Sequence, residues 1–305
     1  MMRPVQLATK EGVSPSRVFL PASDFTLILD FLEWRFPRGT RLGWERRMLA
    51  GRVFDQHGKV VSPDASYQAN QTIYYYRELK EEIPIPVTEG IVYQDERIVI
   101  ADKPHYLPIS PIGPYIQETL QVRLRKRLGL DYLTAAHRLD LETAGLVMFT
   151  IHPEHRNAYQ ALFRQRKIEK VYHAITDRSD EHNQLQFPLM RRSRIENSAR
   201  FMQMQECEGE FNAHTQIDLL QRGDNLSIYE LRPLTGKKHQ LRVHMNALGL
   251  PILHDQIYPE MKEYVPLSNR TYIDKLQLLA FSLRFEDPYS LKNVYVESQI
   301  KLMKI

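Results

Sequence analysis

The chain has 305 residues, of which 43% are hydrophobic, and a formal net charge of +4. This length and composition predict an ordinary globular protein with a main domain and a smaller second part. Apolar runs such as residues 98–101 are far shorter than the roughly 20 residues of a membrane helix, so we expect no membrane association and a cytoplasmic location. Cys207 is the only cysteine, which excludes an intrachain disulfide and a thiolate metal cluster.

Basic residues gather in four clusters along the chain, at residues 35–52, 123–127, 164–170 and 191–200. Clusters of one sign interleaved with Tyr and Phe fit a polyanionic partner, because phosphate contacts supply much of the affinity for nucleic acid. For any single cluster a solvated helix face is the alternative. Four clusters together favour a nucleic-acid partner.

The first part of the chain lacks periodicity, and residues 1–22 are expected to form an irregular arm. Ser23 and Asp24 are plausible N-caps for a helix with apolar residues at helical spacing. Pro37 and Gly39 should end this helix, because neither residue continues a helical backbone well.

A second short helix is expected at residues 42–50, with Gly51 in the left-handed cap. Residues 53–61 predict a hairpin and residues 70–76 a further strand. Two short helices followed by small strands, with arginines along the second helix and the turn before it, resemble a degenerate S-four-type RNA-binding domain, named for the small-subunit ribosomal protein, at residues 23–80. A small packing domain with a basic surface helix is the alternative. The resemblance implies that RNA contacts Arg38, Arg41, Arg46 and Arg47.

Residues 81–89, which contain Pro84 and Pro86, are expected to be a linker, and residues 90–305 a second domain. In that domain the expected strands outnumber the helices, and we expect hairpins to join many of the strands, so we predict an α+β fold on a largely antiparallel sheet. The expected strands lie within residues 91–102 and at 145–151, 168–175, 213–220, 226–232, 283–286 and 294–300, and the expected helices at 116–128, 154–166 and 238–248.

Several familiar sites are absent from the sequence. Gly236-Lys237 is not a phosphate loop, because Lys238 stands where Ser or Thr is needed. His239 and His244 are five residues apart and do not share a helical face, so they make a poor metal pair. Neither a nucleophilic-serine elbow nor a dinucleotide fingerprint is present. We expect no metal and no cofactor.

Asp140 stands out because it directly precedes a turn and a strand-like apolar run. The turn is formed by Thr143-Ala144-Gly145, so the carboxylate should lie at the mouth of a rigid element. Arg242 is its candidate partner. An aspartate beside a guanidinium stays ionised and can act as a nucleophile or an electrostatic stabiliser. From the residues alone, a structural Arg–Asp bridge is an equally open interpretation.

Three strings, in order and spacing, resemble the RluA-type RNA pseudouridine synthases. They are His137-Arg138-Leu139-Asp140 with Thr143-Ala144-Gly145-Leu146, then Lys170-Val171-Tyr172, then residues 236–244 with Gly249-Leu250-Pro251-Ile252 and Asp255. The likeness covers about residues 90–287. Many members of this family also carry an S-four-like domain, which agrees with the N-terminal pattern.

The resemblance implies that specific uridines in rRNA or tRNA are isomerised to pseudouridine without redox, metal or nucleotide energy. Asp140 matches the catalytic aspartate, which either adds to C1′ or abstracts a C2′ proton, and Arg242 matches its counter-charge. Tyr172 matches the tyrosine that stacks on the base and helps remove the C5 proton; a core tyrosine is the alternative. Arg138 matches the residue that fills the space vacated by the base, and Leu241 packs against the pocket.

The chain departs from the family pattern at a few positions. Lys237 and Lys238 replace a more usual Arg-Thr pair, so phosphate contact is expected but bidentate geometry at 237 is lost. Ala144 and Phe281 replace a frequent serine and a late histidine. We expect a monomer acting on structured RNA. The alternatives are a catalytically silent RNA-binding or ribosome-assembly protein on the same fold, and a nucleoside glycosidase.

Overall fold

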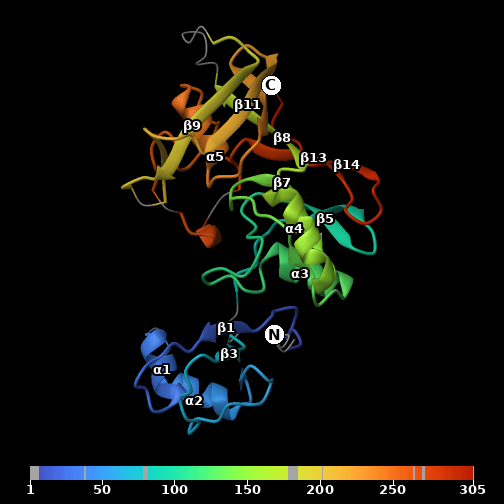
Figure 1. Cartoon of the computed structure of the whole chain (residues 1–305). Coiled ribbons are helices and arrows are strands. Elements are labelled where there is room, and N and C mark those ends of the chain that lie inside the picture. The colour runs from blue at the N-terminus through green and yellow to red at the C-terminus, as the bar shows by residue number, and fades with distance from the viewer. Residues whose placement is uncertain are drawn as a thin grey trace. The chain divides into compact units, whose positions relative to one another are not determined.

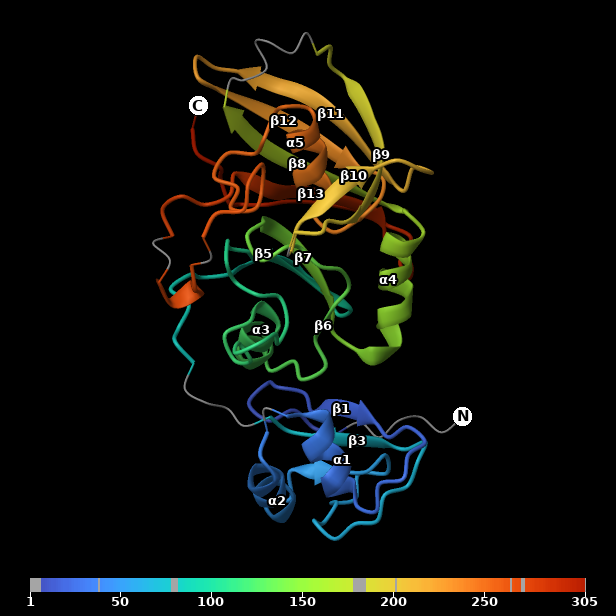
Figure 2. The ribbon, with the colours of Figure 1, turned by 90° about the vertical axis from the view of Figure 1, so that its left-hand side faces the viewer.

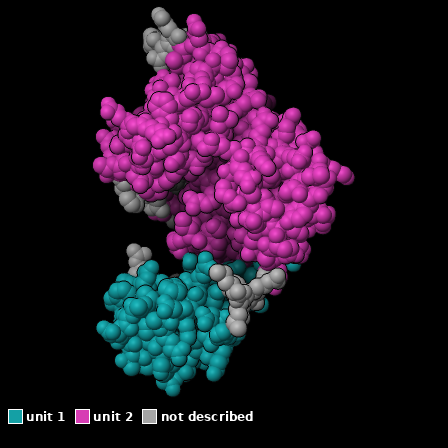
Figure 3. Space-filling model, viewed as in Figure 1, with its two compact units in different colours: residues 1–82, 126–131 teal, residues 83–125, 132–305 magenta. Residues whose placement is uncertain are grey.

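The structure is a computed structural model that describes residues 7–37, 39–77, 82–177, 185–200, 202–263, 265–269 and 272–304. The chain forms two compact units, shown in different colours in Figure 3. Unit 1 comprises residues 1–82 and 126–131, and unit 2 comprises residues 83–125 and 132–305. No helix in these described ranges is long and apolar enough to cross a membrane.

Unit 1 packs two short helices on a small antiparallel sheet with the strand order β1-β3-β2 (Figure 1). Its core joins Phe31 and Leu32 of the first helix to Trp44 of the second and Ile73 of the sheet. The elements are β1 (Ser16–Phe19), α1 (Ile28–Arg35), α2 (Arg41–Leu49), β2 (Val53–Phe54) and β3 (Thr72–Tyr75).

The second helix, the hairpin and the last strand of unit 1 are confirmed. Helix α2 is capped by the Thr40 hydroxyl, which accepts a hydrogen bond from the Gly43 amide at 3.1 Å. Gly51 has a φ of +64°, the left-handed conformation that favours glycine after a helix.

Two predictions for unit 1 are wrong. The first helix begins at Ile28 rather than after Ser23 and Asp24, because the preceding backbone pairs elsewhere: the Tyr67 amide donates to Thr26 O and the Ile28 amide to Ala65 O. Residues 16–19 are strand β1, not an irregular arm, because pairing with β3 satisfies their backbone. A single short strand with one buried apolar residue carries too little periodicity to be recognised.

Unit 2 is built on an 11-stranded sheet in which every pairing is antiparallel except that of β13 with β7 (Figures 1 and 2). The predicted α+β fold on a largely antiparallel sheet is therefore confirmed. The strand path is β10-β9-β11-β12-β8-β13-β7-β5-β4, with β14 beside β13 and β6 beside β7.

The strands are β4 (Gly90–Gln94), β5 (Ile98–Lys103), β6 (Thr134–Ala135), β7 (Ala144–Thr150), β8 (Ile168–Asp177), β9 (Leu189–Asn197), β10 (Met204–Cys207), β11 (Ala213–Arg222), β12 (Leu226–Pro233), β13 (Leu278–Glu286) and β14 (Asn293–Glu297). The helices are α3 (Leu120–Leu128), α4 (Arg156–Arg164) and α5 (Gln240–Ala247), with 3₁₀ turns at Pro153–His155 and Leu267–Asn269.

Helices cover separate parts of this sheet. Strand β7 is buried along its whole length, which explains its continuous apolar sequence. Tyr159 and Leu162 of α4 pack with the β5, β7 and β13 side chains. Helix α5 lies against β9, β10 and β11, and inserts Leu241 and Met245 into a second core (Figure 2).

The predicted strands and helices of unit 2 are present, although some ends differ and three strands were missed. Helix α3 begins at Leu120 rather than residue 116, because the first amides pair outside the helix: Leu120 N donates to Pro108 O and Gln121 N to Ile109 O. Strand β9 was missed because its arginine-rich sequence resembles a polar loop, and β6 and β10 are very short.

Candidate active site

Three neighbouring strands bring the predicted site residues together. In the sheet register Gly145 of β7 lies beside Ala280 of β13, and Ala280 lies beside Tyr172 of β8. Strand β12 pairs with the other side of β8 and continues into the loop at residues 234–239. Asp140, just before β7, therefore meets both Tyr172 and this loop.

Gly145 allows β7 and β13 to approach closely. Its φ is +109°, and a Cβ added there would lie 2.2 Å from the Ala280 carbonyl oxygen. No side chain fits at that distance, so the turn at Thr143-Ala144-Gly145 requires glycine at its last position.

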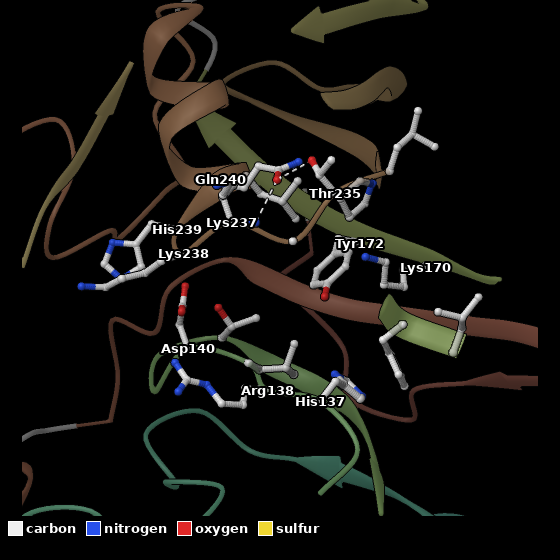
Figure 4. Close-up of a pocket in the computed structure, with 18 of the residues that line it drawn as sticks. His137, Arg138, Asp140, Lys170, Tyr172, Thr235, Lys237, Lys238, His239 and Gln240 are labelled. Carbon is white, nitrogen blue, oxygen red and sulfur yellow. Dashed lines mark hydrogen bonds between the residues drawn. The ribbon is translucent and has the colours of Figure 1, made fainter. Parts of the chain in front are cut away.

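A cavity of about 870 Å³ opens above the meeting point of these strands (Figure 4). It is lined by all the predicted site residues of unit 2, namely Arg138, Asp140, Tyr172, Lys237, Lys238, Leu241 and Arg242. Asp140 enters from the loop before β7, Tyr172 from β8, and the two lysines from the loop before α5 (Figure 4).

Arg242 is buried among three carboxylates. Its guanidinium donates to Asp255 through Nε at 2.8 Å and Nη2 at 2.5 Å, and to Glu142 through Nη2 at 2.8 Å. The carboxylate of Asp140 lies farther away, with Oδ2 3.9 Å from Nη1. These carboxylates outweigh burial and raise the pKa of Arg242, so the guanidinium stays charged.

The loop that carries Asp140 is fastened to the segment after β5. Leu141 O accepts a hydrogen bond from the Tyr106 amide at 2.8 Å and another from Lys103 Nζ at 3.1 Å. The fully buried Lys103 also donates to Pro104 O and Leu107 O. Burial lowers the pKa of Lys103 to about 7, against the opposing effect of Asp140 and Glu142.

Tyr172 lines the cavity together with Asp140 and packs against the core that contains Leu241 and Met245. Burial raises the pKa of its phenol, and the nearby charge of Asp140 raises it further. Tyr172 is therefore a neutral phenol at physiological pH. It can stack and relay a proton, but a tyrosinate would be unfavourable in this position.

The loop that carries Lys237 and Lys238 is held by one buried amide. Gln240 Oε1 accepts from the Thr235 hydroxyl at 2.7 Å and from the Lys237 amide at 3.1 Å (Figure 4). Its Nε2 donates to His214 O at 3.0 Å and to the Thr215 hydroxyl at 2.9 Å. All hydrogen-bonding sites of the Gln240 amide are used, so the loop is fixed to β11.

The remaining predicted residues differ in exposure. Arg138 is exposed at the cavity, whereas Leu241 is buried and packs in the core beneath it. In unit 1, Arg46 is exposed, while Arg41 is engaged by Asp30 and Glu33 at 2.7 and 3.1 Å. The Arg47 guanidinium lies 4.4 Å from the centre of the Trp44 ring. Arg38 lies outside the described residues.

Sequence reasoning missed four residues of this site: Lys103, Glu142, Gln240 and Asp255. Asp255 was part of the matching strings, but its contact with Arg242 was not foreseen. Glu142 and Gln240 sit next to predicted residues in the chain, and their polarity beside apolar strands was the available signal. The buried position of Lys103 was not predicted, because a lysine before a proline suggests a solvent-exposed turn.

Comparisons with known proteins agree with this architecture. The family described as RNA pseudouridylate synthase matches residues 97–247. The dual-specificity RNA pseudouridine synthase RluA of Vibrio cholerae is 32% identical over 66% of this chain and 78% of its own length. An uncharacterized RNA pseudouridine synthase of Synechocystis is 26% identical over 76% of this chain and 79% of its own.

Solved structures give the same result. Human RNA Pseudouridylate Synthase Domain Containing 1 superposes with a TM-score of 0.55 at 25% identity, over 72% of this chain and 86% of its own. Human RNA Pseudouridylate Synthase Domain Containing 4 gives 0.53 at 27% identity, over 70% and 89%. The fold and the site thus have the form of a pseudouridine synthase. The chain belongs to the RluA-type family of RNA pseudouridine synthases, which are isomerases.

Proposed function

We propose that this chain isomerises specific uridines of rRNA or tRNA to pseudouridine, with Asp140 as the catalytic aspartate. The observation that supports this most is the position of Asp140. Its carboxylate lies in the cavity of about 870 Å³, 3.9 Å from the Arg242 guanidinium, and raises the pKa of Tyr172. One cavity thus holds an anion, a fixed cation and an aromatic ring.

The reaction breaks the bond between N1 and C1′, turns the base and joins C5 to C1′. The C5 proton is then released to water, and N1 takes up a proton, so that the product is an isomer of uridine. Asp140 acts where the glycosidic bond breaks, with the fixed positive charge of Arg242 3.9 Å from its carboxylate. Tyr172 stacks on the base, and its neutral phenol relays the C5 proton by accepting it while its own hydroxyl proton passes to water. Arg138, exposed at the cavity, occupies the gap that the flipped base leaves in the RNA.

Asp140→Asn tests the role of the aspartate. The amide keeps the shape of the side chain but cannot act as a nucleophile or base, so we expect tritium release from RNA labelled at uridine C5 to be abolished. RNA affinity should change little, because Asp140 makes no favourable contact with phosphate. Asp274→Asn, an exposed site outside the cavity, is the matched control. Full activity of Asp140→Asn would refute the proposed mechanism.

This experiment also separates the alternatives. A catalytically silent RNA-binding protein would release no tritium in its unaltered form. A nucleoside glycosidase would release free uracil rather than form pseudouridine, which analysis of the digested RNA detects. Mapping pseudouridines in rRNA and tRNA from cells with and without the gene would identify the target.

We further propose that unit 1 is an S-four-like domain that binds RNA backbone through Arg46. Arg46 is exposed on α2, whereas Arg41 is already paired with acidic side chains. Arg46→Gln should weaken RNA binding and reduce the salt dependence of log Kd by about one unit of slope. Arg41→Gln should leave that slope nearly unchanged, as measured by fluorescence anisotropy over a series of KCl concentrations. Equal effects of the two substitutions would contradict the assignment.

A further inference from the structure

The cavity contains a second group of cations that the proposed chemistry does not use. Lys170 lies two residues before Tyr172 on β8, and side chains two apart on a strand face the same side. Both residues line the cavity, and Figure 4 shows the Lys170 side chain next to Tyr172. Lys170 therefore lies roughly 7 Å along β8 from Tyr172, on the same side of the strand.

Lys170 is partly buried without a counter-ion. Within the ranges that the structure describes, its ammonium forms no hydrogen bond or ion pair. Burial lowers the pKa of Lys170, and the charge of Arg166 lowers it further. The adjacent Glu169 is directed to Arg232 at 3.1 Å and Arg284 at 4.0 Å. A partly buried cation with no partner is unfavourable unless a ligand supplies the anion.

The other groups around Lys170 do not neutralise it. Burial and the charge of Lys170 lower the pKa of His137 to about 3, so its imidazole is neutral. Asp140 shifts the pKa of Lys103, Tyr172 and His239, but it does not contribute to that of Lys170. Besides the carboxylates Asp140 and Glu169, the charged lining of the cavity includes Arg138, Arg164, Arg166, Arg232, Lys237 and Lys238.

Arg166 supplies a second, independent observation. Helix α4 ends in a Schellman motif, in which Lys167 N donates to Leu162 O at 2.8 Å and Arg166 N to Phe163 O at 3.2 Å. Arg166 occupies its left-handed position with a φ of +58°, where glycine is the favoured residue. An arginine there is unfavourable for the backbone, yet Arg166 lines the cavity and its charge acts on Lys170.

We propose that Lys170 and Arg166 form a phosphate subsite that binds the phosphodiester next to the target uridine. This inference rests on the proposed function, because Asp140 and Tyr172 define where the uridine lies. The subsite recognises a uridine that carries a phosphate and disfavours the free nucleoside, which has no group to pair with Lys170. Binding the adjacent phosphate also holds the nucleotide in its flipped position.

Substitutions at Lys170 test the subsite. Lys170→Met removes the charge and retains the length of the side chain, and Lys170→Arg retains the charge. With RNA labelled at uridine C5, we expect Lys170→Met to lower kcat/KM about tenfold, mainly through KM, and to reduce its salt-dependence slope by about one unit. Lys170→Arg keeps the positive charge and should retain most of the salt-dependence slope of the unaltered protein. The exposed Lys292→Met is the control and should behave as the unaltered protein.

Thermal unfolding separates binding from a structural role. Lys170→Met removes an unpaired, partly buried charge, and Arg166→Gly removes a side chain from a position that favours glycine. Both variants should keep or raise the Tm while they weaken RNA binding. A lowered Tm together with an unchanged salt slope would overturn the phosphate subsite.

A binding experiment keeps this inference distinct from the proposed function. Ligand-observed NMR titrations with uridine and with uridine monophosphate need no turnover, so they report on Lys170 even if no RNA releases tritium. The unaltered protein should prefer the monophosphate, and Lys170→Met should lose that preference. Inorganic phosphate should compete with the monophosphate in the unaltered protein. A preference that persists in Lys170→Met overturns the inference.

Discussion

The charge arrangement around Arg242 differs from the simple pair expected from the sequence. Its hydrogen bonds go to Asp255 and Glu142, and Asp140 is the outermost of three carboxylates. This order matters for chemistry. The inner two carboxylates hold the guanidinium in place, so Asp140 feels a fixed positive charge without being locked into a hydrogen bond. In the proposed mechanism, this freedom lets Asp140 approach the sugar.

Arg242→Lys tests this arrangement at the level of one side chain. An ammonium cannot bind Asp255 bidentately and reach Glu142 as well, so the positive charge is no longer fixed beside Asp140. We expect tritium release to fall by about 100-fold, and the free energy of unfolding to fall by about 2 kcal/mol. Arg284→Lys, at an exposed position of β13, is the control. Activity within a factor of a few of the unaltered protein would contradict the charge arrangement.

At the scale of elements, the site depends on the register of β7, β13 and β8. The sequence predicted β7 and β8 separately, from an apolar run and from alternation. It did not place both strands next to β13, because β13 lies more than a hundred residues later in the chain. Strand β13 pairs with β7 in parallel and with β8 in antiparallel orientation. Strand pairing between distant segments is set by the whole sheet.

Gly145→Ala tests the close approach of β7 and β13. The added Cβ would meet the Ala280 carbonyl, and the φ of +109° is unfavourable for alanine, so we expect a loss of at least about 2 kcal/mol in unfolding free energy. Chemical denaturation measures this loss. Gly113→Ala is a matched control, because Gly113 also has a positive φ, of +56°, but nothing lies within 4 Å of the added Cβ. A loss no greater than that of Gly113→Ala would show that the approach to Ala280 is unimportant.

At the scale of the whole molecule, unit 2 buries several histidines in the neutral form. Burial lowers the pKa of His137 to about 3, and those of His105, His239 and His244 to about 4. Their unfolded-state pKa is near 6.5, so the unfolded chain takes up these protons at a higher pH than the folded chain. The stabilising effect is complete above about pH 6.5 and is lost as the pH falls toward about 4.

This linkage predicts a steep acid destabilisation. Each of these histidines contributes a slope of about 1.4 kcal/mol per pH unit within that window. Lys103, with a pKa of about 7, is protonated in both states below that pH and does not change the slope there. His137→Gln should make the fall in stability between pH 6.5 and 4 shallower, as measured by urea unfolding, because glutamine does not titrate. The exposed His152→Gln should leave the slope unchanged. The same slope in both variants would contradict the linkage.

The sequence by itself determined much of this protein. Local periodicity predicted the strands and helices near the site, and the strings around Asp140, Tyr172 and Arg242 predicted the family. These features depend on neighbouring residues, which a single sequence records directly. Only the tertiary structure decided the partners of Arg242, the anchoring of the Asp140 loop by Lys103, the role of Gln240 and, among the residues that the structure describes, the lack of a counter-ion for Lys170. Those facts arise from contacts between residues 13 to 100 positions apart in the chain, and the sheet register that sets such contacts is a property of the whole fold.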